Sequence, residues 1–290
     1  MKEHPLRPKV GHIQFLNCLP LYYGLVKSHA LLDIELIKGT PTELNSMLIH
    51  GNLDISPISS IEYARHADSL MLFPDFTVSS DGEVKSILLL SRFPVEQLSG
   101  RKIALTSTSA TSQVLLKIIL KLGYKIEPHY IIRQPDLDSM LAAADAALLI
   151  GDIALKHYAD SKEYYVYDLG VEWKNLAGKN MVYAVWAVNR TFAETKMKLC
   201  ENVFETFRKS MDYSIANLPE IVEYAAQWEP FDPSFLTAYF SSLHFTFEEE
   251  YQDGLIHFYR MAKDIGELET VPHLEFINIR SDVRILNIQS

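Results

Sequence analysis

Asn17 lies where an apolar, strand-like stretch (10–15) gives way to a helix-like stretch (19–27). In open α/β sheets, ligands bind at the carboxyl ends of strands. An asparagine side chain offers both a donor and an acceptor without adding charge. Asparagine is also a favoured helix N-cap. The position therefore predicts either a helix cap or a contact to a polar ligand.

A dense group of hydroxyl side chains fills the segment from Thr106 to Ser112, between a predicted strand and a predicted helix. A helix N-terminus offers free N–H groups and the positive end of the helix dipole. Together with hydroxyl donors, it can hold a carboxylate without lysine or arginine. A plain N-cap needs only one hydroxyl. The excess of donors favours an anion site, with Ser109, Thr111 and Ser112 as candidates.

Three further polar positions follow or open predicted strands. Gly151 and Asp152 follow a buried strand over 146–150, and Ser86 opens a strand over 86–92. A glycine lets the backbone approach a ligand closely. Asp152 could act as a base, although helix capping explains it equally well. Ser86 alone is a weak signal.

Trp173, Tyr183 and Trp186 form an aromatic group that could wall a cleft around an unsaturated ring. Packing in the apolar core is the alternative, and it is the stronger one for at least one of the three.

Several chemistries lack a motif in this chain. It contains no GxGxxG, no Walker A sequence, no HExxH and no GxSxG. His12, His129 and His157 are scattered, and Cys18 and Cys200 form no metal-ligand pattern. We therefore expect neither a cofactor nor a metal.

The charge balance limits the partners. With 27 basic and 37 acidic residues, the net charge is −10. This argues against nucleic acid, which binds to basic faces. An acidic protein also gains no long-range attraction for a small anion, so an anion site must use neutral donors. We expect a small anionic molecule as the partner; the oligomeric state is not predicted.

The cellular location is predicted from the absence of a signal region and of a membrane-spanning segment in the sequence. No apolar signal region follows the charged stretch 1–8, and no apolar run reaches the ~18 residues of a membrane span. The sequence therefore predicts a cytoplasmic protein without a membrane anchor.

The order of the elements predicts an α/β protein with two lobes. Strand and helix signals alternate over 10–73, where 69–73 is the last expected strand, and again over 102–189. Amphipathic helices take over from 191, and the tail after Leu268 is expected to form a loose strand. We expect residues 1–90 and 190–290 to form one lobe and 91–189 an inserted second lobe. The strands 86–92 and 181–189 would cross between them, with a ligand cleft between the lobes.

The chain resembles the chorismate dehydratase family of the futalosine route to menaquinone. The resemblance covers residues 10 to about 265, and the order of the matching stretches is specific. One stretch, 176–181, departs from the family pattern. The matching stretches are 11–21, 51–64, 84–91, 109–112, 149–155, 168–170 with Trp173, and 182–187.

The resemblance implies a periplasmic-binding-protein-like fold (type 2) and cofactor-free dehydration of chorismate to 3-[(1-carboxyvinyl)oxy]benzoate. It implies that Asn17 and Ser86 lie at the reacting ring. The base would be Asp152 or the substrate's own side-chain carboxylate. The remaining expected substrate contacts are Ser59, Ser109, Thr111, Ser112, Gly151, Trp173 and Tyr183.

Two other functions fit the same pattern. One is the related 1,4-dihydroxy-6-naphthoate synthase of the same pathway, although the opening around Asn17 fits the dehydratase better. The other is a cytoplasmic solute-binding or sensor protein that closes on an anion without chemistry.

Overall fold

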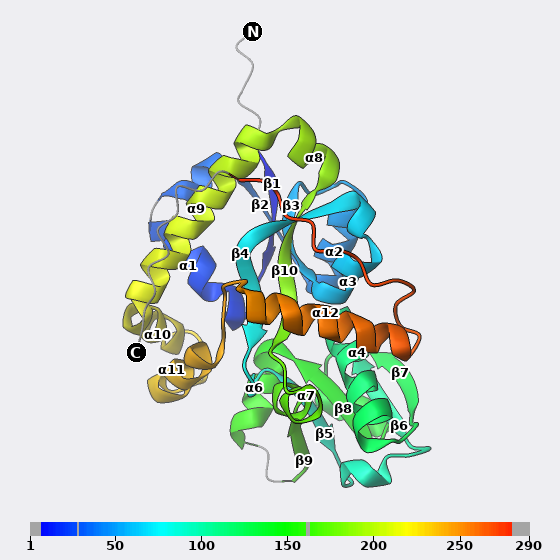
Figure 1. Ribbon diagram of the computed structural model, residues 1–290. Coiled ribbons are helices and arrows are strands. Elements are labelled where there is room, and N and C mark those ends of the chain that lie inside the picture. The colour runs from blue at the N-terminus through cyan, green and yellow to red at the C-terminus, as the bar shows by residue number, and fades with distance from the viewer. Residues whose placement is uncertain (1–6, 28, 161–162, 280–290) are drawn as a thin grey trace.

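Two five-stranded sheets lie one above the other in the computed structural model, which describes residues 7–27, 29–160 and 163–279 (Figure 1). The first sheet contains β1 (Lys9–Ile13), β2 (Glu35–Gly39), β3 (Ile55–Ser59), β4 (Leu70–Ser80) and β10 (Met181–Asn189). The second contains β5 (Ile87–Ser91), β6 (Lys102–Thr106), β7 (His129–Arg133), β8 (Ala146–Ile150) and β9 (Tyr165–Asp168).

The helices surround these sheets and also form the end of the chain. Those of the first lobe's α/β part are α1 (Leu19–Lys27), α2 (Pro41–Ile49) and α3 (Ser60–Arg65). Those beside the second sheet are α4 (Ala110–Ile118), α5 (Leu137–Ala143), α6 (Gly151–Asp160) and α7 (Leu169–Ala177). The later helices are α8 (Arg190–Thr195), α9 (Met197–Ala216), α10 (Leu218–Ala226), α11 (Pro233–Ser242) and α12 (Glu249–Asp264).

The two sheets have the same internal order. The first runs β2-β1-β3-β10-β4 and the second β7-β6-β8-β5-β9. In each sheet three strands are parallel, and a fourth lies antiparallel between the third and the last. That antiparallel strand is β10 in the first sheet and β5 in the second. β10 follows the whole second lobe in sequence, whereas β5 begins the continuous segment that forms the second sheet.

The sheet membership of these two strands corrects the expected lobe boundaries. Because β5 pairs in the second sheet and β10 in the first, the chain crosses between sheets at 81–86 and at 169–180. The boundaries expected at 90 and 189 each lie one strand too late. All five residues of β5 are buried, as are most of those of β10. A strand covered on both faces carries no pattern that tells which sheet it joins. Residues 1–6 and 280–290 of the expected first lobe lie outside the described residues.

Local sequence explains the helix starts around the cleft. Thr40 and Glu43 form a capping box at the start of α2, with Pro41 as its first residue. Ser109 caps α4, and Asp168 caps α7 by accepting from two backbone N–H groups. These caps fix where the helices begin and therefore where their N-terminal N–H groups point.

Three elements differ from expectation. The strand expected at 69–73 continues as β4 to Ser80. It passes through a bulge-like irregularity near Asp75, which has φ +66°, and the pairing with β10 shifts register there. Helix α7 was not predicted from the sequence. The tail after Leu268, expected as a loose strand, makes one isolated bridge, from Leu72 to Phe276.

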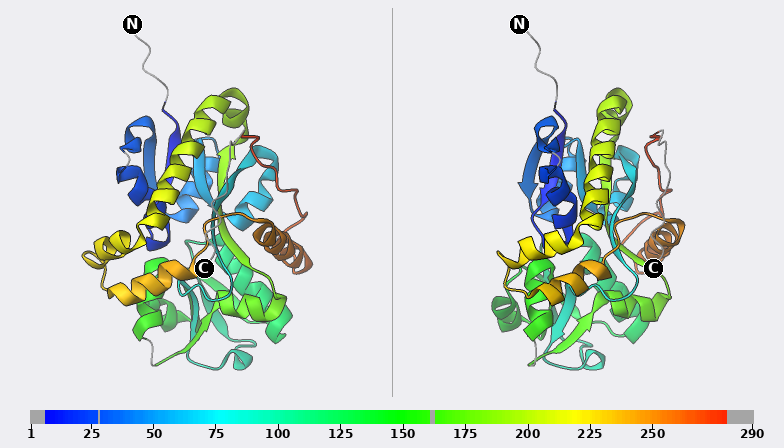
Figure 2. Two further views of the ribbon diagram at one scale, coloured as in Figure 1. Left: turned by 60° about the vertical axis from the view of Figure 1, so that its left-hand side comes forward. Right: turned by 90° about the vertical axis from the view of Figure 1, so that its left-hand side faces the viewer.

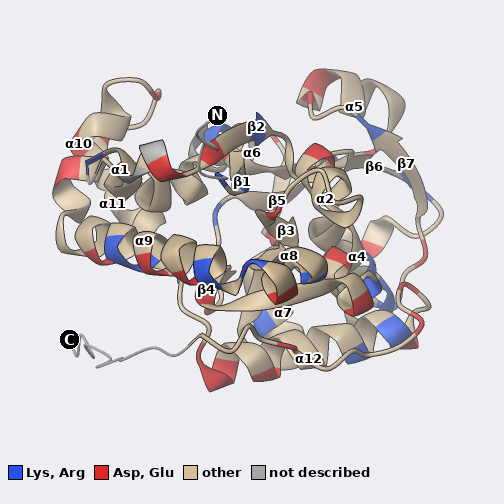
Figure 3. Ribbon diagram, turned by 90° about the horizontal axis from the view of Figure 1, so that it is seen from above, with Lys and Arg blue, Asp and Glu red and all other residues tan. Residues whose placement is uncertain are grey.

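The last helices connect the lobes from outside. Helices α10 and α11 lie side by side and reach toward α6 of the second lobe, and α12 runs across β10 and α4 (Figures 1 and 2). Basic and acidic residues are interspersed along α9, whereas α12 begins with Glu249, Glu250 and Asp253 and has Arg260 and Lys263 toward its end (Figure 3). None of the described helices combines the length and apolarity needed to cross a membrane.

Candidate active site

A small cavity lies between the sheets, at the carboxyl ends of β1, β3 and β8. Its volume is about 60 Å³, and none of the described residues that line it is charged. Seven of the expected site residues meet here, from both lobes. They are Asn17, Ser59, Ser86, Ser109, Ser112, Gly151 and Tyr183.

Asn17 lines the cavity, and its side-chain oxygen does not cap a helix. It lies inside a single 3-10 turn, Leu16–Cys18, which leads directly into α1. Its Oδ1 atom is buried and has no hydrogen-bond partner among the described residues. A buried acceptor without a donor is costly, and a hydroxyl of a bound molecule would supply that donor.

Ser59 and Ser86 face the same cavity from opposite lobes. Ser59 Oγ accepts from Asn45 Nδ2 at 3.1 Å, so its own proton can be donated elsewhere. Ser86 is 2 % exposed, and its hydroxyl donates to Val84 O over a long 3.3 Å. Its carbonyl accepts from Gly151 N at 2.8 Å, which fixes the residue at the cavity wall.

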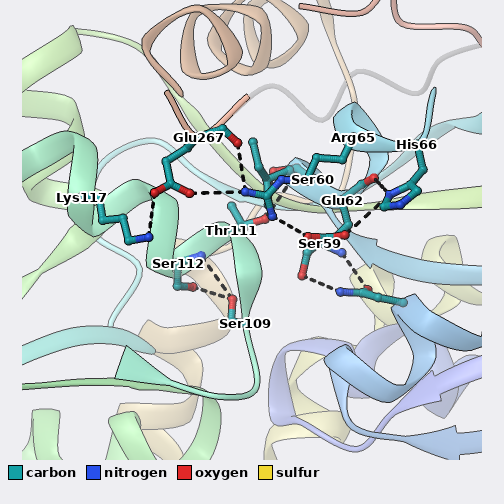
Figure 4. A network of polar contacts seen from close by, with 12 residues as sticks. Ser59, Ser60, Glu62, Arg65, His66, Ser109, Thr111, Ser112, Lys117 and Glu267 are labelled. Atoms are coloured by element: carbon teal, nitrogen blue, oxygen red, sulfur yellow. Dashed lines mark hydrogen bonds and ion pairs between the residues drawn. The ribbon is translucent and has the colours of Figure 1, made fainter. Parts of the chain in front are cut away.

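The hydroxyl-rich segment divides its side chains between two tasks. Ser109 and Ser112 line the cavity, and their hydroxyls lie 2.8 Å apart at the start of α4 (Figure 4). Thr106 and Thr108 bond to each other instead. Residues three apart share a helix face, which explains why Ser109 and Ser112 point the same way. The site therefore combines two hydroxyls with a helix N-terminus.

Thr111 and Trp173 do not line the cavity, which corrects two expectations. Thr111 Oγ1 lies 3.3 Å from Ser60 Oγ and accepts from Ile61 N, so it joins α4 to α3 of the other lobe. Two positions beyond Ser109, its side chain leaves the face of α4 that Ser109 and Ser112 share. Trp173 is fully buried and donates to Asn180 O, so its ring belongs to the core.

Of the other two aromatic residues, Tyr183 lines the cavity and Trp186 does not. The Tyr183 hydroxyl lies 2.9 Å from Ser80 Oγ, and burial raises its pKa far above the ordinary value. It therefore stays neutral. Trp186 is 1 % exposed and packs against Phe76, as the core alternative predicted.

Asp152 lies beside the cavity but faces a different space. Its Oδ1 accepts from Leu16 N at 3.0 Å, which ties α6 to the turn that carries Asn17. The carboxylate lines a neighbouring groove of about 490 Å³, together with His12 and Trp228. Burial, opposed by the Leu16 N–H, raises the pKa of Asp152 to about 6. Asp152 therefore does not line the cavity that Asn17 and Ser86 share, although the sequence grouped the three as catalytic candidates.

Phe15 divides the groove from the cavity and lines both. Its ring lies against Gly151, where a Cβ atom would meet three ring carbons at 3.2 Å. Gly151 also has φ +65°, a conformation that other residues adopt at a cost. The glycine is therefore required by the approach of Phe15 as well as by the turn.

The two lobes are bonded to each other around the cavity. Thr42 Oγ1 donates to Ser107 O at 2.9 Å on one side, and Leu16 N donates to Asp152 on the other. Farther out, Glu267 accepts from both Lys117 and Arg65 (Figure 4). These bonds close the cavity at a volume below that of small-molecule sites, which span roughly 300–1,000 Å³.

Two residues near the cavity gave no usable signal in the sequence. Phe15 lies within the opening motif but reads as the end of a strand. Tyr239 of α11 is fully buried beside Ser86, and it lies on the core face of an ordinary amphipathic helix. Nothing in its local pattern distinguishes it from a packing residue.

No group of three metal-ligating side chains converges in the part of the chain that the structure describes. Both cysteines are free and buried. Cys18 lines the cavity, and burial raises its pKa to about 12, so the thiol remains protonated.

Residues 8–264 match the model of a family described as menaquinone biosynthesis. A relative from Thermus thermophilus, named chorismate dehydratase, is 32% identical over 255 residues, which are 82% of this chain and 91% of the relative. The chain belongs to this family. A second relative with the same name, from Campylobacter jejuni, is 26% identical over 222 residues, or 72% of this chain and 84% of its own. The family resemblance expected from the sequence motifs is confirmed.

Solved structures place the family's fold in a larger group. A protein from Archaeoglobus fulgidus superimposes with a TM-score of 0.74 at 20% identity, covering 91% of this chain and 99% of its own. A Candida albicans protein described as having the generic periplasmic binding protein fold gives 0.67 at 12% identity, covering 96% and 99%. At these identities the likeness concerns the fold alone, and it confirms the expected periplasmic-binding-protein-like architecture.

Proposed function

We propose that this protein is a chorismate dehydratase, a hydro-lyase that converts chorismate to 3-[(1-carboxyvinyl)oxy]benzoate and water. The observation that carries the proposal is the buried, unpaired Oδ1 of Asn17, which faces an uncharged cavity with the Ser86 hydroxyl in its wall. The curated relatives of the same family bear this enzyme's name.

The reaction requires orientation more than strong acid or base. Chorismate carries a ring hydroxyl next to the carbon that bears the enolpyruvyl ether. Loss of the proton at that carbon and of the hydroxyl makes the ring aromatic, which drives the reaction. An enzyme for this step gains most by holding one ring conformation and by stabilising the leaving oxygen.

Both lobes contact the substrate in the proposed complex. Asn17 Oδ1 accepts a hydrogen bond from the ring hydroxyl and orients it. Ser86 donates to the same oxygen as the C–O bond breaks. Ser109 and Ser112, with the N-terminal N–H groups of α4, hold a carboxylate. Ser59 and Tyr183 complete the wall around the ring.

We assign proton abstraction to the substrate's own side-chain carboxylate. The carboxylate takes the proton from the ring carbon that bears the ether, the electron pair of that C–H bond forms the new ring double bond, and the C–O bond of the neighbouring hydroxyl breaks. The carboxylate then returns the proton to the departing hydroxyl, which is released as water. Asp152 has a pKa suited to a base, but its carboxylate is held by Leu16 N and lines the neighbouring groove. Its proposed role is to hold the turn of Asn17.

Substrate entry requires the lobes to separate, because a cavity of about 60 Å³ holds only a few waters. The two crossings at 81–86 and 169–180 are the covalent links about which the lobes can turn. Thr42–Ser107 and Leu16–Asp152 are the bonds that must break first.

Incubation of purified protein with chorismate tests the function. We expect the diene absorbance of chorismate to disappear and a benzoate product to form. Binding of chorismate without conversion would support a solute-binding protein instead. Neither binding nor conversion would favour the 1,4-dihydroxy-6-naphthoate synthase.

A further inference from the structure

Tyr239 carries a buried hydroxyl that the fold leaves without use. The residue lies on α11, and its side chain is fully buried. Its hydroxyl has no hydrogen-bond partner among the described residues. Buried tyrosine hydroxyls ordinarily find a partner. In a helix whose other inward residues are Leu236 and Phe240, phenylalanine would fill the position without leaving a donor unpaired.

Helix packing places this hydroxyl on the side of Ser86. Helix α11 lies against α6 through the rings of Phe235 and Tyr158, whose centroids are 6.4 Å apart, and Tyr239, four residues on, shares the face of Phe235. The start of α6 is bonded to Ser86, because Gly151 N donates to Ser86 O at 2.8 Å.

Burial raises the pKa of Tyr239 far above its ordinary value, and the neighbouring Ser86 hydroxyl opposes part of that rise. Tyr239 therefore remains a protonated donor. The two hydroxyls form no hydrogen bond with each other, and Ser86 Oγ donates to Val84 O at 3.3 Å. That bond is long for two oxygens, so the Ser86 rotor is weakly held.

Asn17 Oδ1 and the Tyr239 hydroxyl are an acceptor and a donor, both buried and both unpaired. Asn17 shares the cavity wall with Ser86, and Tyr239 lies next to Ser86 from the side of α11. Ser86 can therefore connect the donor to the site.

We infer that Tyr239 is a positioning residue that donates its O–H to Ser86 Oγ and thereby turns the Ser86 proton away from Val84 toward the leaving hydroxyl of the substrate. The inference rests on the role of Ser86 in the proposed function. A hydroxyl that accepts a hydrogen bond becomes a better donor, so Tyr239 both orients Ser86 and strengthens its bond to the departing oxygen.

Tyr239→Phe removes the hydroxyl and keeps the ring. We expect kcat for chorismate dehydration to fall by about tenfold, less than the roughly 100-fold or more of a group that transfers a proton itself, while KM changes less than about twofold. Tyr63→Phe is the matched control. Tyr63 is also fully buried, but its hydroxyl bonds to backbone at His273 and Glu275, away from the cavity.

A double-mutant cycle separates positioning from packing. The variants Tyr239→Phe, Ser86→Ala and their combination are compared in single-turnover reactions with enzyme in excess, so that slow rates are measurable. If Tyr239 acts through Ser86, its removal causes no further loss in the Ser86→Ala background.

Two outcomes overturn the inference: an unchanged kcat in Tyr239→Phe, or a full multiplicative loss in the double variant. A Ser86→Ala enzyme with normal turnover would instead overturn the proposed role of Ser86. Thermal melting of each variant verifies that it is folded before the rates are compared.

Discussion

The two lobes share a strand order but differ at the loops where corresponding strands end. After β1, the first lobe has a short 3-10 turn that holds the unpaired Oδ1 of Asn17. After β6, the second lobe has a capped helix start in which the Ser109 and Ser112 hydroxyls already bond to each other. The turn after β1 leaves a buried acceptor without a donor, whereas the two hydroxyls at the start of α4 are hydrogen-bonded to each other. This contrast supports the proposal that the turn of Asn17 orients the reacting hydroxyl, whereas the start of α4 holds the anion.

The contrast predicts the largest effect at the first lobe. Asn17→Ala removes the acceptor, and we expect kcat to fall by about 100-fold or more, the loss typical of one positioned polar group. Little stability should be lost, because the Asn17 Oδ1 forms no bond in the fold. Steady-state kinetics with chorismate and a thermal melt measure both. Asn52→Ala, at an exposed position, is the control. Near-normal turnover would remove Asn17 from the site.

The second lobe should affect binding instead. Ser112→Ala removes a donor from the carboxylate site but leaves Ser109 as the cap of α4. We expect KM to rise by about tenfold, roughly the worth of one hydrogen bond to a charged group, with kcat nearly unchanged. The exposed Ser69→Ala serves for comparison. A fall in kcat at constant KM would contradict the division of tasks between the lobes.

Gly151→Ala tests how closely the lobes approach. The new methyl would meet the Phe15 ring at 3.2 Å, and φ is +65°. Gly178→Ala has a nearly identical φ of +67° and no atom within 4 Å of its Cβ, so it carries the backbone strain alone. That strain costs about 1 kcal/mol. We expect Gly151→Ala to lose more stability than Gly178→Ala in chemical unfolding. Equal losses would show that Phe15 yields freely.

The last prediction concerns the pH dependence of stability at Asp152. Its folded pKa of about 6 exceeds the ordinary 3.8, so the folded state binds the proton more tightly. The carboxyl therefore favours folding most at low pH, and this contribution disappears as pH rises from about 4 to 6.

Asp152→Asn keeps an acceptor for Leu16 N without a charge. Relative to the wild type, its stability should rise across that interval and then level off, by at most about 3 kcal/mol from the size of the shift. Chemical unfolding at several pH values measures the difference, and the exposed Asp138→Asn provides the comparison. A flat difference across pH 4 to 7 would mean that Asp152 does not titrate as described.

The sequence predicted most of the helices and strands, because buried strands and amphipathic helices have clear periods. It did not predict their pairing. Strands β5 and β10 are apolar except for the polar residue that ends each of them, so no alternation indicates their sheet. The inner part of β4 was missed because Pro74 and Asp75 interrupt the run at a bulge.

The candidate site shows a similar limit. Polar residues at strand ends, such as Asn17 and Gly151, could be found because the topology of α/β sheets gathers them. Thr111 was assigned to the site because its type matched, but the helical turn directs it to α3. The surroundings of the Asp152 carboxylate and the Tyr239 hydroxyl depend on how the two lobes pack against each other. A one-dimensional pattern contains no information about which lobe face a side chain meets.

The position of β10 in the first sheet also determines in what order the chain can fold. Every strand of the second sheet lies between Ile87 and Asp168, so that sheet can be completed from one continuous segment. The first sheet cannot, because β10 must insert between β3 and β4 after the whole second lobe has been synthesised. On the ribosome, the second lobe is therefore the earliest unit able to close, and β1 to β4 wait with an open gap in their sheet. Pulse-labelling hydrogen exchange would detect this as protection in β6 and β8 before protection in β3.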